Sequence, residues 1–205
     1  MEDLQHMRRI PLSQHTIGPF FPADYFRPGD NDLTRLSADA EPTGKGTPFV
    51  LTGTVRKEGG DPVANAILEL WQADAAGRFR HPEDPEADKA DPDFLGWGRA
   101  WSTIEGVYDF RSVRPGPYVE DGRKRAPHLN IIVMGIGLMR TVETTLFFPE
   151  FPEENAQDPV LTTLPEDLRH MLILRDLGEV DGVQTYGFDF LLRGPRGLET
   201  PFFET

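Results

Sequence analysis

Apolar and polar residues alternate over short stretches along most of this chain. These stretches are rich in β-branched and aromatic residues and are bounded by turn signals. No long stretch keeps the 3.6-residue apolar period of a helix, and 19 prolines and 20 glycines interrupt the chain throughout. The pattern therefore predicts an all-β fold. The predicted strands cover residues 49–57, 66–74, 96–103, 107–113, 128–136, 142–148 and 185–192.

The predicted architecture is a two-sheet, mostly antiparallel β-sandwich with little helix, because strands at this spacing are joined by tight turns. Asp181-Gly182 is the dipeptide that a type I′ hairpin turn prefers, and alternation resumes after it. One short helix is expected from residue 166 to about 172. Thr163 and Glu166 have the spacing of a capping box there, and Pro165 suits the first turn.

The 205 residues are predicted to form a single domain, with an extended amino-terminal arm over 1–47 and a sandwich core over 48–205. The arm contains the aromatic and proline-rich stretch "GPFFPADYF". Left in solvent, such a stretch would form a sizeable apolar patch. The arm is therefore expected to pack across the domain or against another chain.

Composition and charge argue against several classes of function and of binding site. The 34 acidic residues against 21 basic ones give a net charge of −13, which argues against binding nucleic acid or an anionic membrane surface. The absence of cysteine excludes disulfides, thiolate metal sites and cysteine nucleophiles. With no signal-peptide pattern and no apolar run of membrane-spanning length, the expectation is a soluble cytoplasmic protein.

Tyr118 and His128 are the candidate chemical pair, because both lie at predicted strand ends beside Gly and Pro. A phenolate oxygen and an imidazole nitrogen suit ferric iron. A second histidine two residues on would face the same way, but Asn130 stands there. From the residues alone, His128 belongs either to a metal site or to a hydrogen-bonded strand, and the second interpretation is favoured. No nucleophile elbow, phosphate-binding loop or zinc-protease helix motif is found.

The stretch "LTGTVRKEGGDPVANAILELWQADAAGRF" resembles the signature of the intradiol ring-cleaving dioxygenases. "RPGPY" and "RAPHLN" follow in the order that the family uses, and the resemblance covers most of the chain. It implies the β-sandwich fold of the intradiol dioxygenases, which is of the transthyretin-like type. It also implies non-haem ferric iron chemistry, in which O₂ opens a catechol ring between its two hydroxyls.

The resemblance implies an iron held by two tyrosines and two histidines. Tyr118 matches one tyrosine and His128 the first histidine, whereas Phe79 and Asn130 occupy the other two places. Arg125 matches the cation expected three residues before the histidine. These residues are therefore interpreted as a vestigial iron site, and no metal or catalytic residue is expected on this chain alone.

In members of the family built from two homologous chains, one chain carries the iron and the arm of the other closes part of the substrate pocket. The resemblance therefore implies Fe(III) on a homologous partner chain, in an obligate assembly. It also implies that Thr16, Gly18, Pro19 and Phe20 of this chain line the partner's pocket.

Ile136 stands where an arginine is expected near the substrate ring, and Arg140 is a candidate replacement. The substituent on the catechol is therefore left open. Two other hypotheses are kept. The chain could be an active homomeric enzyme that recruits Tyr108 or His81 as ligands, or a transthyretin-like sandwich that binds a partner or small ligand without catalysis.

Overall fold

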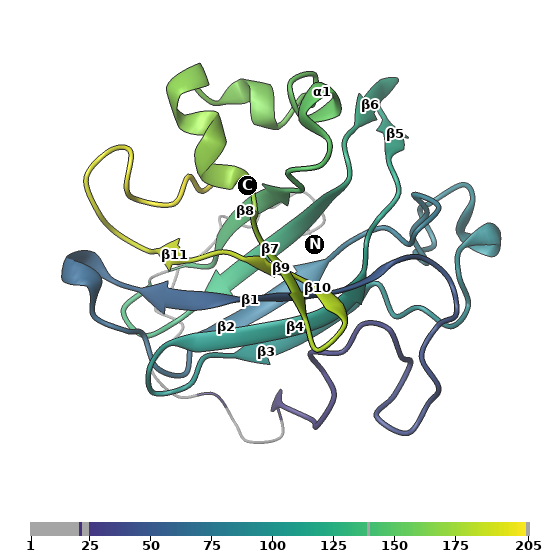
Figure 1. Ribbon diagram of the computed structural model, residues 1–205, viewed down its shortest axis with the longest axis horizontal. Helices are drawn as coiled ribbons and strands as arrows, with labels where there is room; N and C mark the ends of the chain where they lie inside the picture. Colours follow the sequence, from purple (N-terminus) through teal and green to yellow (C-terminus); the bar gives the residue numbers. More distant parts are fainter. Residues whose placement is uncertain (1–20, 22–24, 139, 204–205) are drawn as a thin grey trace, which may run out of the picture.

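Two sheets stacked face to face form the body of the protein (Figure 1). The computed structural model describes residues 21, 25–138 and 140–203. Strands dominate this part of the chain, so the predicted all-β sandwich is confirmed. The strands are β1 (Pro48–Arg56), β2 (Ile67–Trp71), β3 (Trp97–Trp101), β4 (Val107–Val113), β5 (Tyr118–Glu120), β6 (Arg123–Arg125), β7 (His128–Met134), β8 (Val142–Phe147), β9 (Arg175–Val180), β10 (Val183–Gly187) and β11 (Phe190–Leu191).

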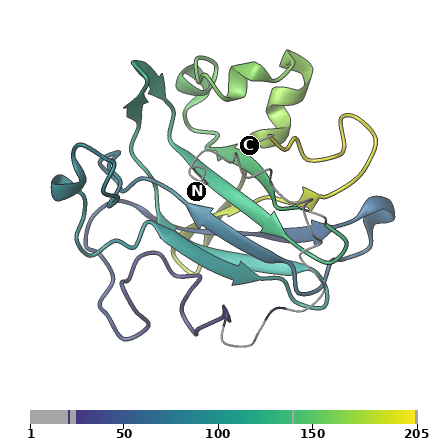
Figure 2. The same ribbon diagram turned by 180° about the vertical axis from the view of Figure 1, so that it is seen from behind.

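The two large sheets differ in strand direction. In the five-stranded sheet, ordered β11-β1-β10-β9, β1 runs parallel to β10 and β11 and pairs antiparallel with β4 along its other edge. The four-stranded sheet, ordered β3-β2-β7-β8, is antiparallel throughout and lies in front when the molecule is seen from behind (Figure 2). A third sheet consists only of the hairpin β5–β6.

Side chains from the facing surfaces of the two large sheets meet in one apolar core. Because successive strand residues point to opposite faces, every second position of a strand can be buried there. The core accounts for the alternating pattern of the sequence, and Tyr108 and Tyr186 are buried in it. Its largest members include Phe49, Leu51, Leu68, Leu70, Phe110, Phe147, Phe148 and Phe190.

Gly53 allows two segments of the five-stranded sheet to approach closely. Between β10 and β11 the chain runs alongside β1, where the backbone N–H of Phe188 donates to Thr52 O at 2.9 Å. A Cβ atom on Gly53 would lie only 1.6 Å from Phe188 O. The same carbonyl accepts a hydrogen bond from the Tyr108 hydroxyl at 2.8 Å. A side chain at position 53 would therefore push these strands apart.

Segments outside the strands cover the sheet edges. In the arm, the backbone N–H of Leu33 donates to Arg111 O of β4, and Leu33 O accepts from the N–H of Leu95. Leu33 itself is fully buried, so this part of the arm packs across the domain. Near the other terminus, the N–H of Phe203 donates to Glu143 O of β8. Both contacts satisfy backbone groups that an open edge would leave exposed.

Hairpin and helix predictions had different outcomes. Asp181 and Gly182 both have positive φ, 52° and 78°, so the predicted type I′ turn is confirmed. The segment from residue 166 to 172 is helical, but it is a 3₁₀ helix that begins after Pro165 without a side-chain cap. The capping-box prediction is wrong, because the Thr163 hydroxyl instead donates to the carbonyl of Val160 at 2.7 Å.

The helices of the described residues are short and gather mainly between β8 and β9, at one end of the sandwich (Figure 1). None of them has the length and apolar character that a bilayer span requires. They are η3 (Glu58–Gly60), η4 (Ala87–Lys89), α1 (Pro152–Asn155), η5 (Leu161–Thr163) and η6 (Glu166–Leu172).

Candidate functional site

The hairpin β5–β6 holds the first residues of the site. Tyr118 begins β5 and pairs with Arg125 at the end of β6. The two-residue loop between the strands is Asp121-Gly122, and both residues have positive φ, 49° and 74°. This is again type I′ geometry, which favours Asp-Gly. The dipeptide was the signal that could have predicted this hairpin from the sequence.

Tyr118 and His128 contact each other directly. The Tyr118 hydroxyl lies 3.3 Å from His128 Nε2, and His128 Nδ1 lies 2.6 Å from the carbonyl oxygen of Ala126. A carbonyl can only accept, so Nδ1 carries the ring proton and Nε2 is the acceptor. Tyr118 therefore donates to His128. The sequence-predicted pair is thus brought together, and each polar atom of His128 has a partner within the chain.

Burial keeps both side chains uncharged. It raises the pKa of Tyr118 to about 12, a rise that the neighbouring Arg125 cation opposes. Burial also lowers the pKa of His128 to about 4, and Arg125 adds to that decrease. At neutral pH the pair is a phenol hydrogen-bonded to a neutral imidazole.

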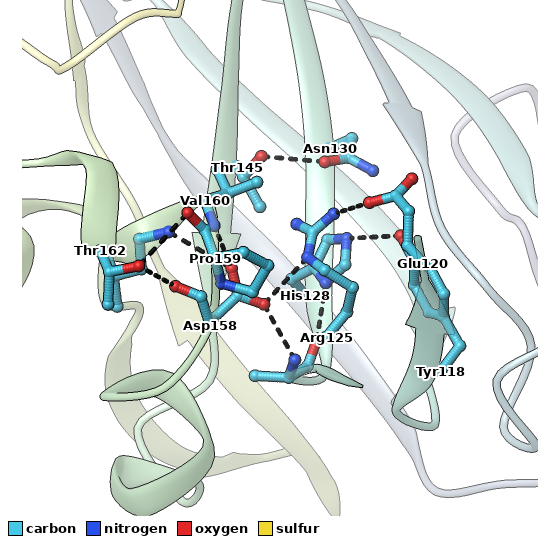
Figure 3. A network of polar contacts seen from close by, with 12 residues as sticks. Tyr118, Glu120, Arg125, His128, Asn130, Thr145, Asp158, Pro159, Val160 and Thr162 are labelled. Carbon is cyan, nitrogen blue, oxygen red and sulfur yellow. Dashed lines mark hydrogen bonds and ion pairs between the residues drawn. The ribbon is translucent and has the colours of Figure 1, made fainter. Parts of the chain in front are cut away.

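Arg125 is buried behind this pair and is neutralised by two carboxylates (Figure 3). Its Nε donates to Asp158 Oδ2 at 3.0 Å, and Nη1 donates to Glu120 Oε2 at 2.5 Å. Asp158 Oδ2 also accepts the backbone N–H of Ala126 at 2.9 Å. Asp158 therefore ties the end of the hairpin to the segment before His128, and sequence reasoning gave no sign of this role.

Phe79 and Asn130 lie beside the pair but add no strong metal donor. The Phe79 ring meets Tyr118 edge to face, with centroids 5.0 Å apart and an angle of 88° between planes. On β7, Asn130 accepts the Thr145 hydroxyl at 2.9 Å through Oδ1 (Figure 3). A phenyl ring has no oxygen to offer, and a carboxamide is a poor transition-metal ligand.

A cleft of about 650 Å³ opens between loop 76–86 and the hairpin β5–β6. Tyr118 and Asn130 form part of its wall, whereas His128 is buried behind Tyr118. Within the described residues, no group of three or more His, Cys, Asp or Glu side chains could hold a metal ion. The other lining residues are Trp71, Ala76, Gly77, Arg78, Phe79, His81, Asp84, Pro85, Glu86, Pro117, Val119 and Glu120.

Other sequence-predicted residues lie apart from the cleft. Ile136 is 53% exposed in the turn between β7 and β8, at the opposite end of β7 from His128. Arg140 lies near the end of the same turn and is exposed. Tyr108 is buried in the core with its hydroxyl bonded to Phe188, so it does not reach the cleft. The predicted pocket residues Thr16, Gly18, Pro19 and Phe20 lie outside the described residues.

Comparison with known proteins identifies the family. The sequence model of a family described as "Dioxygenase" matches residues 17–194. The chain belongs to the intradiol dioxygenases. It is 36% identical to the protocatechuate 3,4-dioxygenase beta chain of Burkholderia cepacia, covering 90% of this chain and 82% of that one. Its identity to the alpha chain from the same species is 32%, over 92% and 94% of the two chains.

Solved structures agree on the fold of this intradiol dioxygenase chain. Catechol 1,2-dioxygenase from Pseudomonas arvilla C-1 superposes with a TM-score of 0.58 at 23% identity, covering 92% of this chain and 64% of that one. For 3-chlorocatechol 1,2-dioxygenase from Rhodococcus opacus 1CP the TM-score is 0.57 at 23% identity, over 82% and 68% of the chains. At these identities the likeness shows the shared fold alone.

The ferric iron used by the intradiol dioxygenases does not fit the donors that the described residues place at this site. Of the two-tyrosine, two-histidine set that the resemblance implies, only the Tyr118 oxygen and His128 Nε2 converge, 3.3 Å apart. The places of the other two donors hold the Phe79 ring and the Asn130 amide.

Proposed function

We propose that this chain is the non-iron-binding, alpha-type subunit of a heteromeric protocatechuate 3,4-dioxygenase. A homologous beta-type subunit carries Fe(III) and performs the O₂-dependent intradiol cleavage of protocatechuate to 3-carboxy-cis,cis-muconate. This chain shapes the wall of the partner's pocket and contributes to an obligate alpha-beta protomer within a higher cytoplasmic oligomer. An assembly that cleaves another substituted catechol is the alternative.

The donor set at Tyr118 carries this proposal. Sequence identity does not choose between the subunit types, because the chain is 36% identical to one beta chain and 32% identical to alpha chains. The chemistry of the site favours the alpha type, since half of the expected ligands are a phenyl ring and a carboxamide. The positions proposed to line the partner's pocket are Thr16, Gly18, Pro19, Phe20 and Ile136.

Expression with and without a partner tests the assignment. Alone, the chain should bind no stoichiometric iron and show no visible phenolate-to-iron absorption. Co-expressed with a homologous chain that carries all four ligands, it should form a tight complex with one iron per pair. Oxygen uptake by that complex on protocatechuate, catechol and other substituted catechols identifies the substrate.

A matched pair of variants separates the roles of the two subunits. Tyr118→Phe in this chain should leave turnover by the complex nearly unchanged, because no iron is held here. The same replacement of an iron-ligand tyrosine in the partner should abolish turnover and change the visible spectrum. A purified single chain that is coloured and active, with Tyr118→Phe removing both properties, would overturn the proposal.

A further inference from the structure

We propose that Arg99 and Glu69 position the amino-terminal arm by clamping Tyr25 onto the outer face of the four-stranded sheet. The inference rests on the proposed function, in which arm residues 16–20 of this chain line the partner's pocket. It adds the fixed point from which those residues are presented. Arg99 and Glu69 act through the arm, so they are positioning residues and not catalytic ones.

The clamp is built on two neighbouring strands. Glu69 of β2 and Arg99 of β3 lie directly opposite each other in the sheet. Gly98 and Ala100 on either side of Arg99 are buried, so Arg99 points to the outer face. Its Nε and Nη2 both donate to Glu69 Oε1, at 2.9 and 2.5 Å. The two side chains are only 15% and 18% exposed, so this pair holds the guanidinium in one orientation.

The guanidinium of Arg99 contacts Tyr25 in two ways. Nη1 donates to the carbonyl oxygen of Tyr25 at 2.8 Å. The Cζ atom lies 3.9 Å from the centroid of the Tyr25 ring and 5.0 Å from that of Trp97, which are cation–π distances. A planar guanidinium can donate along its edges while its faces stack on rings, which an ammonium group cannot do. Arg99 therefore joins both the backbone and the side chain of Tyr25 to the sheet.

Further contacts continue this attachment along the arm. The rings of Phe26 and Trp101 pack with centroids 4.3 Å apart, and the N–H of Arg99 donates to Asp30 O at 2.7 Å. The arm accordingly follows the β3 side of the sandwich in both views (Figures 1 and 2). Among the described residues, Tyr25 is the one nearest the amino terminus that accepts a hydrogen bond from the sheet. It is therefore the last fixed point before the pocket-lining segment.

The position of Tyr25 limits where the preceding residues can lie. Phe20 is five positions before Tyr25, so it can be at most about 18 Å from the clamp. If the clamp opened, the next hydrogen bond to the sheet would be at Asp30, and the tether to Phe20 would double to ten positions. The effective concentration of a tethered group falls roughly as the −3/2 power of tether length, so doubling lowers it about threefold. The clamp should therefore favour binding of the arm in the partner's pocket.

Limited proteolysis of the full-length chain tests whether the clamp holds the arm. Chymotrypsin accepts large apolar side chains, and the bond between Phe26 and Arg27 directly follows the clamp. Arg99→Met should raise the cleavage rate at this bond about tenfold, because losing the hydrogen bond and the ring contacts makes opening more frequent. Arg175→Met is the matched control, since it removes an exposed arginine from β9 of the other large sheet. Tyr25→Leu gives a second test if circular dichroism shows that Arg99→Met does not fold.

Kinetics of the complex with an iron-bearing chain test whether the clamp positions the arm. Tyr25→Leu removes the aromatic ring and leaves the pair of Arg99 and Glu69 in place. It should raise KM for the catechol substrate about threefold and leave kcat and iron content unchanged, because the iron site of the partner is not touched. Tyr25→Phe should behave like the wild type, since the clamp uses the ring and the carbonyl but not the hydroxyl. A role in stability alone would lower the yield of complex and not raise KM.

The two experiments separate this inference from the alpha-type assignment. The clamp is refuted if chymotrypsin cleaves the folded Arg99→Met or Tyr25→Leu chain no faster than the wild type. The positioning role is refuted if Tyr25→Leu opens the arm but leaves KM unchanged, or if Tyr25→Phe raises KM equally. If no complex with an iron-bearing chain forms, the alpha-type assignment fails and the positioning role fails with it, whereas proteolysis still decides whether the clamp holds the arm.

Discussion

Replacing Asp158 by asparagine should destabilise the protein more than any comparable surface change. The carboxylate is fully buried, and its Oδ2 accepts both Arg125 Nε at 3.0 Å and the N–H of Ala126 at 2.9 Å. Its Oδ1 accepts the N–H of Val160 at 2.9 Å. An asparagine oriented to keep the Val160 contact would point its NH₂ group at two donors, so both contacts on that side would be lost.

The size of the effect follows from the burial of Arg125. Removing one partner of a buried ion pair costs about 3–5 kcal/mol, because the remaining charge is left uncompensated. Arg125 is 4% exposed, but it keeps the Glu120 carboxylate, which is 53% exposed on its side chain. The loss should therefore fall near the lower limit, about 3 kcal/mol. That is a large share of the roughly 5–15 kcal/mol by which domains are stable.

Urea unfolding monitored by circular dichroism measures this change. Asp61→Asn is the control, because its ion pair with Lys57 spans 3.6 Å between side chains that are 72% and 60% exposed. The control should change the free energy of unfolding by less than about 1 kcal/mol. If Asp158→Asn lowers the free energy of unfolding no more than the control does, Asp158 does not hold the site as argued.

Three further predictions test the site and the core. Acid should destabilise the protein through His128, because its pKa is about 4 in the folded state against 6.5 in the unfolded state. Protons therefore bind the unfolded state more tightly and lower the free energy of unfolding by about 2 kcal/mol at pH 5. Urea unfolding of His128→Gln should lack this part of the pH dependence. Phe79→Tyr combined with Asn130→His should restore donors, so ferric loading should give visible absorption that neither single change produces. Gly53→Ala should lower the melting temperature strongly, because its Cβ would overlap Phe188 O.

Local turn chemistry made parts of the fold predictable from the sequence. Asp181-Gly182 lies between alternating apolar residues, and its hairpin could be predicted because the dipeptide and the strand pattern agree. Asp121-Gly122 forms the same turn, but its neighbours are charged, so no strand pattern drew attention to it. The cap proposed at Thr163 failed because its hydroxyl found a nearer carbonyl in the preceding turn.

The site was predictable only in part, because some of its contacts join residues that lie far apart in the sequence. Tyr118 and His128 could be paired because both stand beside turn signals, and their contact at 3.3 Å confirms that they meet. Asp158 lies 33 positions after Arg125 in the chain, and no local pattern links the two. Contacts between residues so far apart in the sequence depend on how the loops fold over the sheet. The periodicity of apolar residues does not encode the path of a loop.

Loss of iron need not unfold a site of this kind, provided that its polar groups find partners in the protein. An unpaired phenol or imidazole buried in the sandwich would cost about 1–3 kcal/mol each. Here Tyr118 and His128 satisfy each other, and Ala126 O accepts the remaining imidazole proton. A buried cation at this site would repel a metal ion. The charge of Arg125 is instead neutralised by the carboxylates of Asp158 and Glu120. On the proposed alpha-type assignment, these hydrogen bonds hold the two side chains in place where a ferric ion would do so in the partner subunit.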